Sequence, residues 1–186
     1  SIKNYNCKIL EQTQKGYGNA LIEGINNVET KYFCIFNADG SFDPSELKKM
    51  HNIAQNENFD LVFGSRYEKN AGSEDDTIIT FIGNKIFSLL GKVFFSLPIS
   101  DILYTFVLGD TQKIKKLKLI KDDFGFCVEL PIKAKKESLK LTISPAFERK
   151  RIGGKKKVNA FKDGFKILIT MGALYLNLIW KISKSI

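Results

Sequence analysis

Histidine and cysteine are scarce in this chain of 186 residues, which has one histidine and three cysteines. The single histidine, His51, rules out the usual zinc sites, because these combine several imidazole and thiolate ligands. A bound metal would be held mainly by oxygen, which favours magnesium or manganese. Cys7, Cys34 and Cys127 are too few and too scattered for a disulfide framework. We therefore expect reduced thiols and a reducing compartment.

The sequence also lacks the pattern of a signal peptide, and its uncharged stretch near the C-terminus is short for a membrane-spanning helix. Its first residues are polar and include no basic segment followed by an apolar one. The uncharged stretch 167–180 is shorter than the roughly 20 residues that cross a bilayer. We expect this stretch to form a helix that is buried or lies at a membrane interface.

The composition is that of a globular domain. Hydrophobic residues make up 44% of the chain, enough to bury a core at this length. No internal repeat and no linker divides the sequence. We expect one α/β domain with a helical C-terminal arm.

Two continuous apolar runs, 32–36 and 59–63, have the length of strands covered on both faces. Between them, Asp43 and Pro44 are typical of a helix start, with Asp43 as the N-cap. Strand, helix and strand in this order predict a parallel unit, whose ligands bind at the carboxyl ends of its strands. Those ends are residues 37–41 and 64–66.

The remaining pattern predicts a helix over 82–94 that Pro98 closes, and a turn at Ser100 and Asp101. Pro131 is expected to start or kink a helix running to Lys136. A last strand is predicted over 139–143.

A basic segment is followed directly by an apolar one near the C-terminus. Six of the nine residues in 149–157 are cationic, which is two thirds of the formal net charge of +9. Two adjacent glycines would let this segment fold around a small anion such as a phosphate. The alternative is a solvated charge run. The apolar helix that follows favours a phosphate-bearing substrate at a membrane surface.

Side chains at the two strand ends could bind a cation and a diphosphate. Asn37 and Asp39 stand two residues apart and both carry oxygen ligands. Arg66 follows the second strand. The alternatives are an ordinary turn at Asn37 to Gly40 and a surface ion pair at Arg66.

Six segments in this order resemble glycosyltransferase family 2, in particular its dolichol-phosphate mannose synthase and polyprenol-phosphate glycosyltransferase branch. The resemblance runs from Cys7 to about Ile169. It implies an inverting enzyme with a GT-A fold, a nucleotide-sugar donor, and a divalent cation, Mg²⁺ or Mn²⁺, at an Asp-x-Asp motif. The segments are Gly16-Tyr17-Gly18-Asn19-Ala20, residues 36–44, Gly64-Ser65-Arg66, Gly83-Asn84, Ser100-Asp101 and residues 151–159.

The resemblance also implies roles for individual residues. Asp39, with Asn37, would bind the metal and the diphosphate. Gly16 and Gly18 would shape the loop near the nucleotide. The phosphate groups would be held by Ser65, Arg66, Arg151 and Lys157.

This chain departs from the family pattern at several positions. Asn37 replaces the first acid of the Asp-x-Asp motif, so the metal site loses one charge. No arginine follows the Asp101 segment, and Lys156 stands where a serine is usual. The N-terminal strand with its Pro-x-x-Asn-Glu segment and the Asp-Asp-x-Ser segment are not found. We therefore interpret residues 1–157 as a partial catalytic domain and 158–186 as an apolar helix, interfacial or packed on that domain.

The acceptor decides whether a base is needed. A polyprenyl phosphate is ionised near neutral pH and needs none, whereas a hydroxyl acceptor, as in cell-surface polysaccharide synthesis, requires one. Asp101 and Glu129 are the candidate bases, with a turn cap and a structural ion pair as their alternatives. The basic segment favours the lipid phosphate.

Two rival functions remain at this point. One is a catalytically impaired, membrane-associated transferase fragment. The other is a basic binding protein, for which nucleic acid is a poor partner, since the aromatic residues fall in apolar patterns rather than among Lys and Arg. We expect a cytoplasmic protein that is peripheral at the cytoplasmic face of the membrane.

Overall fold

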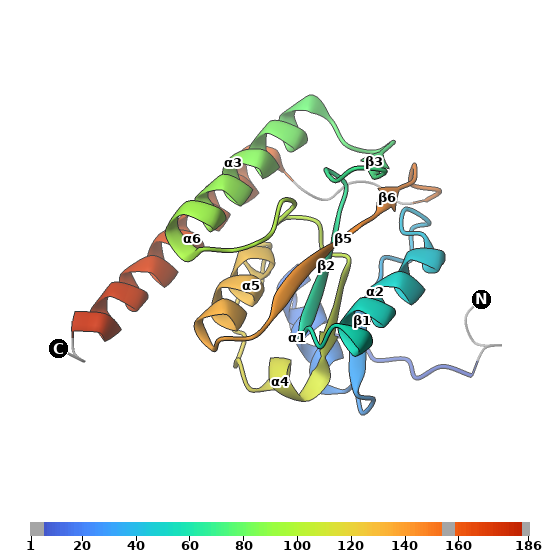
Figure 1. Cartoon of the computed structure of the whole chain (residues 1–186), viewed down its shortest axis with the longest axis horizontal. Coiled ribbons are helices and arrows are strands. Elements are labelled where there is room, and N and C mark those ends of the chain that lie inside the picture. Colours follow the sequence, from blue (N-terminus) through green and yellow to red (C-terminus); the bar gives the residue numbers. More distant parts are fainter. Residues whose placement is uncertain (1–5, 154–158, 184–186) are drawn as a thin grey trace.

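The computed structural model describes residues 6–153 and 159–183, without the side chains of 179–183. A four-stranded sheet forms the centre (Figure 1). Its order is β1-β4-β2-β5, with β1 as one end strand. The strands are β1 (Tyr32–Ile35), β2 (Leu61–Ser65), β4 (Val107–Asp110) and β5 (Leu141–Pro145).

A small parallel pair and six helices complete the described part of the chain. The pair joins β3 (Gly72–Ser73) to β6 (Phe147–Glu148). The helices are α1 (Tyr17–Asn26), α2 (Pro44–Asn56), α3 (Ile78–Phe95), α4 (Thr111–Lys115), α5 (Phe126–Lys136) and α6 (Ala160–Ser183).

The predicted parallel unit is wrong in its pairing. Strands β1 and β2 run in the same direction, but β4 lies between them and pairs antiparallel with both. The parallel partner of β2 is β5. The ends of β1 and β2 therefore lie at one edge of the sheet, with the start of β4 between them.

The helix boundaries follow local signals. The carboxylate of Asp43 accepts a hydrogen bond from the Ser45 amide at the start of α2, with Pro44 in the first turn, as predicted. Helix α3 ends at Phe95 and is followed by Ser96 as its C-cap, in the left-handed conformation with a φ of 53°. Pro131 lies inside α5, which begins five residues earlier at Phe126.

Two apolar clusters pack on the two faces of the sheet. Side chains alternate between faces along a strand, so Leu61 and Phe63 join one cluster while Val62 joins the other. Helix α2 covers the smaller cluster through Met50 and Ala54. The larger cluster packs beneath α1, α3, α5 and α6. This two-sided cover explains the continuous apolar runs of the strands.

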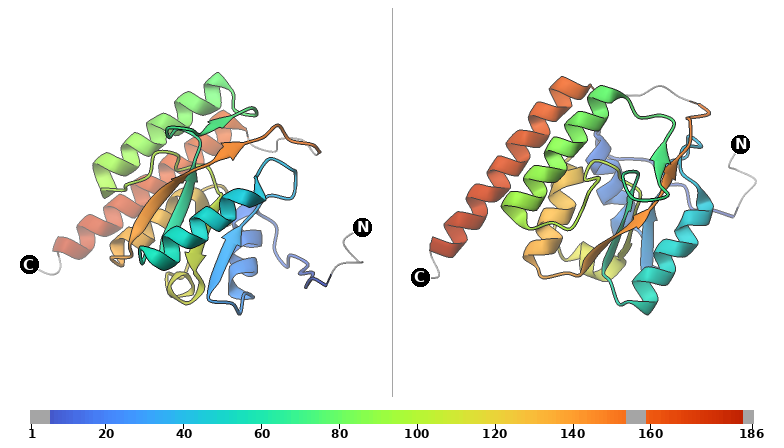
Figure 2. Two further views of the ribbon diagram at one scale, coloured as in Figure 1. Left: turned by 45° about the vertical axis from the view of Figure 1, so that its right-hand side comes forward. Right: turned by 45° about the horizontal axis from the view of Figure 1, so that its top comes forward.

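Helix α6 packs along α3 and on α5 (Figures 1 and 2). Ile167, Thr170 and Met171 of α6 are buried, whereas the opposite side of α6 is exposed. By length and composition, α3 is the one described helix apolar enough to cross a membrane, with 18 residues and a mean hydropathy of 1.5. Only 22% of it is buried.

Candidate active site

One edge of the sheet collects most of the predicted site residues. The carboxyl ends of β1, β2 and β5 and the start of β4 meet there. Asp39 follows β1 and Arg66 follows β2. Arg151 follows β6, the short strand that comes next after β5 in the chain. The chain thus brings three predicted residues from distant segments to one place.

Asp39 is held in a tight turn beneath the segment 149–152. Its Oδ1 atom accepts hydrogen bonds from the Ser41 amide at 3.0 Å and the Ser41 hydroxyl at 2.6 Å. The Ile152 amide donates to the Asp39 carbonyl at 2.8 Å. Gly40 has a φ of +83°, and a Cβ atom there would lie 2.5 Å from Ile152. A residue with a side chain would be strained at this φ, which favours glycine at this position.

The second carboxylate oxygen of Asp39 faces a guanidinium group. Arg151 lies 3.3 Å from Asp39 and 3.9 Å from Asp75, so it bridges two acids from separate loops. Burial alone would raise the pKa of Asp39, but the hydrogen bonds from Ser41 and the charge of Arg151 outweigh it and lower the pKa. Asp39 is therefore ionised at neutral pH, and its outer oxygen attracts a cation.

Arg66 is the centre of a buried ionic network. Its Nε and Nη2 atoms donate to the two oxygens of Asp101 at 2.8 and 2.9 Å, and Nη1 donates to Glu148 at 2.9 Å. Burial opposes its charge, yet the hydrogen bonds and charge of Asp101, with Glu148, raise the pKa of Arg66 above its ordinary value. The ring of Tyr104 lies 4.5 Å from the guanidinium carbon. In this structure the cation is fully engaged by protein acids.

Asp101 and Ser65 belong to the same network. Asp101 is 0% exposed and also accepts hydrogen bonds from the Arg66 amide and from Asn84. The Ser65 hydroxyl is 2.8 Å from that of Ser100 and accepts from the Tyr67 amide. Both side chains therefore have protein partners.

Gly16 and Gly18 permit a close backbone approach. The Gly18 amide donates to the Asp122 carbonyl at 2.8 Å, and a Cβ atom at either glycine would lie within 2.2 Å of a carbonyl oxygen in 121–122. Tyr17 between them bonds to Thr105, just before β4, at 2.6 Å. The two glycines thus lie at the site edge of the sheet, and packing against 121–122 already requires them.

Glu129 lies in a separate structural cluster. Its side chain is 1% exposed, accepts hydrogen bonds from the amides of Ile120 and Lys121, and pairs with Lys133 at 2.7 Å. These contacts fasten the loop before α5 to the helix. Neither Asp39 nor Arg66 is among these partners in the described part of the chain, and a catalytic role for Glu129 remains a prediction.

The metal prediction rests on Asn37 and Asp39. Asn37 is half-buried, and its amide makes no hydrogen bond within the described chain. The part of the chain that the structure describes contains no group of three or more His, Cys, Asp or Glu side chains able to hold a metal. A cation here would thus need ligands from the substrate. Lys157, predicted to bind phosphate, lies outside the described residues.

Sequence reasoning missed four members of this site. Glu148 and Asp76 contact Arg66, Asp75 contacts Arg151, and Asn84 contacts Asp101. Asp75 and Asp76 precede an apolar helix, and acidic residues are common just before a helix begins. Their positions in the sequence therefore gave no sign of a site. Only the Gly83-Asn84 segment carried a signal, through the family resemblance.

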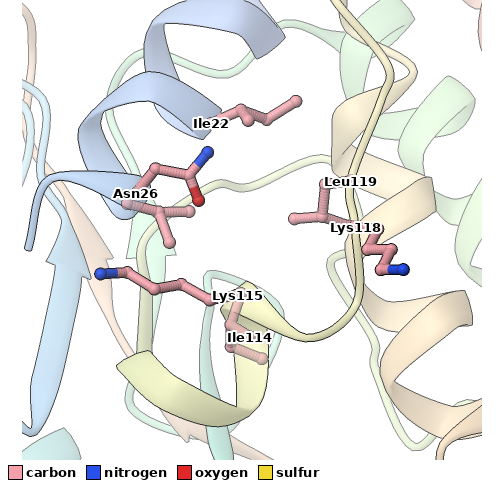
Figure 3. A pocket seen from close by; sticks show the side chains of 7 residues that line it. Ile22, Asn26, Ile114, Lys115, Lys118 and Leu119 are labelled. Atoms are coloured by element: carbon pink, nitrogen blue, oxygen red, sulfur yellow. The ribbon is translucent and has the colours of Figure 1, made fainter.

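A pocket lies at the opposite end of the sheet, between α1 and α4 (Figure 3). Two lysines line this pocket, Lys115 and Lys118. Lys115 donates to the Val28 carbonyl at 2.7 Å and so stabilises the fold. Strand β4 separates this pocket from the site, since β4 begins at the site edge and ends at α4. The lining residues are Ile22, Ile25, Asn26, Ile114, Lys115, Lys118 and Leu119.

Sequence comparison finds matches that cover much of this chain. The model of glycosyl transferase family 2 matches residues 1–118. The low-salt glycan biosynthesis hexosyltransferase Agl6 of Haloferax volcanii is 24% identical over 160 residues. That match covers 85% of this chain but only 38% of Agl6.

Structural comparison finds glucosyl-3-phosphoglycerate synthase from Mycobacterium tuberculosis. Its complex with Mn²⁺, UDP-glucose and phosphoglyceric acid has a TM-score of 0.60 at 10% identity, and its complex with phosphoglyceric acid alone has 0.59 at 12%. Each match covers 87% of this chain and 55% of the synthase. The predicted α/β fold of the GT-A type is confirmed, over about half the length of these solved structures.

Proposed function

This chain belongs to glycosyltransferase family 2, and from that premise we propose that the full-length protein transfers a sugar from a nucleotide-sugar donor to a lipid phosphate of the polyprenyl type. The observation that carries the proposal is the contact between Asp39 and Arg151, 3.3 Å apart, at the strand-end edge. A carboxylate and a guanidinium in contact provide one group for a cation and one for a phosphate.

The residues present fit a magnesium or manganese ion. Asp39 and Asn37 offer only oxygen ligands, and the outer oxygen of Asp39 already faces a positive charge. Mg²⁺ is commonly bound by one or two carboxylates plus substrate phosphates, which suits a site with a single acid. The ion would neutralise charge on the departing diphosphate. Arg151 would then leave Asp39 and turn to a phosphate group.

The chemical step is a single displacement with inversion. An oxygen of the acceptor phosphate attacks the anomeric carbon, the new C–O bond forms on that face, and the bond to the nucleoside diphosphate breaks. The acceptor is already ionised, so no proton has to be removed. The protein holds two anionic reactants together and stabilises the leaving group.

The state of the two candidate bases favours a phosphate acceptor over a hydroxyl. Asp101 is enclosed by Arg66 and Asn84, and Glu129 by two backbone amides and Lys133. A general base must reach the proton that it removes, and neither carboxylate is exposed. We infer structural roles for both. A hydroxyl acceptor would require a base from another part of the protein.

The acceptor places the reaction at a membrane. Helix α6 follows segment 149–153 in the sequence, and its Phe161 and Phe165 are exposed. We expect these apolar side chains to contact the chain of a lipid phosphate bound near Arg151. Basic segments bind to the anionic lipids of the cytoplasmic leaflet. A peripheral position at that face of the membrane follows as part of the proposal.

The test is sugar transfer by the full-length protein. Labelled nucleotide sugars are incubated with polyprenyl phosphate and Mn²⁺, and the lipid is extracted. Labelled lipid that depends on both the cation and the phosphate supports the proposal. Label on a hydroxyl acceptor alone would overturn the lipid phosphate, and the absence of any transfer would favour a catalytically impaired protein.

Asn37→Asp is expected to tighten metal binding. An anionic ligand replaces a neutral amide, so the Mn²⁺ concentration for half-maximal activity should fall, on the order of tenfold for one added charge near a divalent ion. A manganese titration of both proteins measures it. An unchanged titration would mean that residue 37 does not contact the ion.

Replacing Lys155, Lys156 and Lys157 with glutamine is expected to weaken binding to anionic lipid. Each surface cation contributes about 1 kcal/mol near an anionic bilayer, so three losses lower the partition coefficient about 100-fold. The KM for polyprenyl phosphate should rise, with little effect on donor affinity. If the variant sediments with anionic vesicles as well as the parent, these lysines form only a solvated surface.

A further inference from the structure

Helices α3 and α6 carry most of the large apolar side chains that the protein exposes. Of 19 such side chains among the described residues, eight lie on α3 and five on α6, with exposed fractions from 42% to 82%. A soluble monomer usually exposes patches of only a few hundred Å². We call this set the two-helix face: Ile78, Ile79, Phe81, Ile82, Ile86, Leu89, Val93, Phe94, Phe161, Phe165, Leu168, Ile169 and Leu176.

The exposed side chains form one stripe on each helix. On α3 the stripe follows steps of three and four residues from Ile78 to Val93. On α6 it follows such steps from Phe161 to Ile169, and Leu176 lies seven residues, or two turns, farther along. The two helices run side by side in the same direction (Figure 2). Tyr175 contacts the rings of Phe94 and Phe95. Because the opposite side of each helix is buried in the domain, both stripes point outward together.

Lysines lie along the two outer margins of this face. Gly164 of α6 faces Phe87 of α3. Lys85 precedes Phe87 by two residues, and at about 100° per residue that puts it on the side of α3 away from α6. Lys162 and Lys166 stand two residues before and after Gly164, on the side of α6 away from α3. All three lysines are exposed, and Lys166 also pairs with Asp123 of the domain at 3.3 Å.

We propose that the two-helix face docks on an anionic membrane, with α3 and α6 lying flat in the headgroup region. Interfacial helices bury an apolar face while lysines at its margins reach the headgroups. This inference deepens the proposed function and rests on it, because the membrane is the surface that would present the lipid acceptor.

Contacts of α3 with the domain exclude a membrane-spanning role for it. Asn84 donates to the buried Asp101, and Ser88 accepts from the Ile102 amide at 3.1 Å. A helix that crossed the bilayer would lose both bonds. Charge argues against a second copy as the occupant, because a symmetric contact would bring the marginal lysines of the two copies together. Anionic headgroups complement them instead.

Docking in this orientation brings the site to the lipid surface. Helix α3 begins directly after Asp75 and Asp76, which contact Arg151 and Arg66. Both helices start on the β3 and β6 side of the domain (Figure 1). The strand-end edge therefore lies next to the end of the face at which both helices begin.

A matched pair of triple variants tests the proposal. Ile82→Gln, Ile86→Gln and Leu89→Gln remove apolar area from the face. Ile9→Gln, Leu10→Gln and Ile120→Gln change the same residue types at exposed positions elsewhere. With vesicles of equal parts phosphatidylcholine and phosphatidylglycerol, the first variant should partition on the order of 100-fold less than the parent. The second should match the parent, and unchanged thermal melting shows that both are folded.

Two further measurements separate the alternatives. Replacing Lys85 and Lys162 with glutamine should reduce binding to the anionic vesicles and leave binding to pure phosphatidylcholine unchanged. Alkaline carbonate should release the bound protein, whereas a membrane-spanning helix would resist it. Equal partition of the face variant and the parent would overturn the proposal, as would a face variant that changes only the oligomeric mass in solution.

Failure of docking and failure of the transferase proposal give different results. Vesicle binding is measured without donor or acceptor, and donor affinity is measured without vesicles. If the face variant loses vesicle binding but the parent transfers no sugar, the docking proposal is supported and the transferase proposal is rejected. If the parent transfers sugar but does not bind vesicles, the transferase proposal is supported and the docking proposal is rejected.

Discussion

Replacing Asp39 with asparagine is expected to lower sugar transfer on the order of 1,000-fold, as when a preorganised charge-stabilising group is removed. Asparagine keeps an oxygen that accepts the two hydrogen bonds from Ser41, so the turn should persist. The substitution therefore removes the charge of the carboxylate and little else. Asn37 is neutral, so the Asn37–Asp39 pair would then contain no acid. Transfer of labelled sugar to polyprenyl phosphate measures the effect.

Asp75→Asn is the matched control for this change. Asp75 contacts the same guanidinium at 3.9 Å, so its variant also weakens the hold on Arg151. If cation and diphosphate bind at Asp39, the Asp75 variant should retain most of the activity. Equal losses in the two variants would show that the ion pairs of Arg151, rather than a bound cation, account for the effect, and full activity of Asp39→Asn would reject Asp39 as a catalytic residue.

Replacing Arg66 with alanine is expected to lower the free energy of unfolding by about 3 to 5 kcal/mol, because it leaves the buried Asp101 charge without its partner. Glu148 and Asp76 would lose the same cation. Urea denaturation of the two proteins measures the difference. Stability, rather than donor affinity, should show the larger change.

Arg149→Ala is the control for a surface ion pair. Arg149 is about half exposed and pairs with Asp43, an arrangement worth at most about 1 kcal/mol. Arg66→Lys should recover only part of the stability, because an ammonium group cannot make the bidentate contact with Asp101. A cost for Arg66→Ala as small as that of Arg149→Ala, together with a large loss of donor affinity, would instead support the phosphate-binding role implied by the family resemblance.

Much of the secondary structure could be predicted because its signals are local. The apolar run 32–36, the Asp43 cap and the helix closed by Pro98 are each encoded within a few residues. Strand pairing is not local: nothing within β1 or β2 indicates that β4, more than 40 residues after β2, inserts between them. That insertion turned the predicted parallel pair into a mixed sheet.

The same distinction applies to the site. Asp39 and Arg66 could be placed at the strand ends because each follows an apolar run. The partners of Arg66 could not, since Asp101 and Glu148 are 35 and 82 residues away in sequence. Gly16 and Gly18 were recognised, but their packing against 121–122 depends on a fold that brings together segments about 100 residues apart.

Strand β1 ends the sheet, and within the described residues no strand pairs with its outer side. Backbone amides and carbonyls along such a margin can pair with an extended segment from another molecule. Phe36, which follows the strand and is exposed, adds apolar surface at the same place. Self-association through this margin would join two sheets into one, so concentrated samples of this chain by itself are prone to aggregate unless another segment of the protein covers β1.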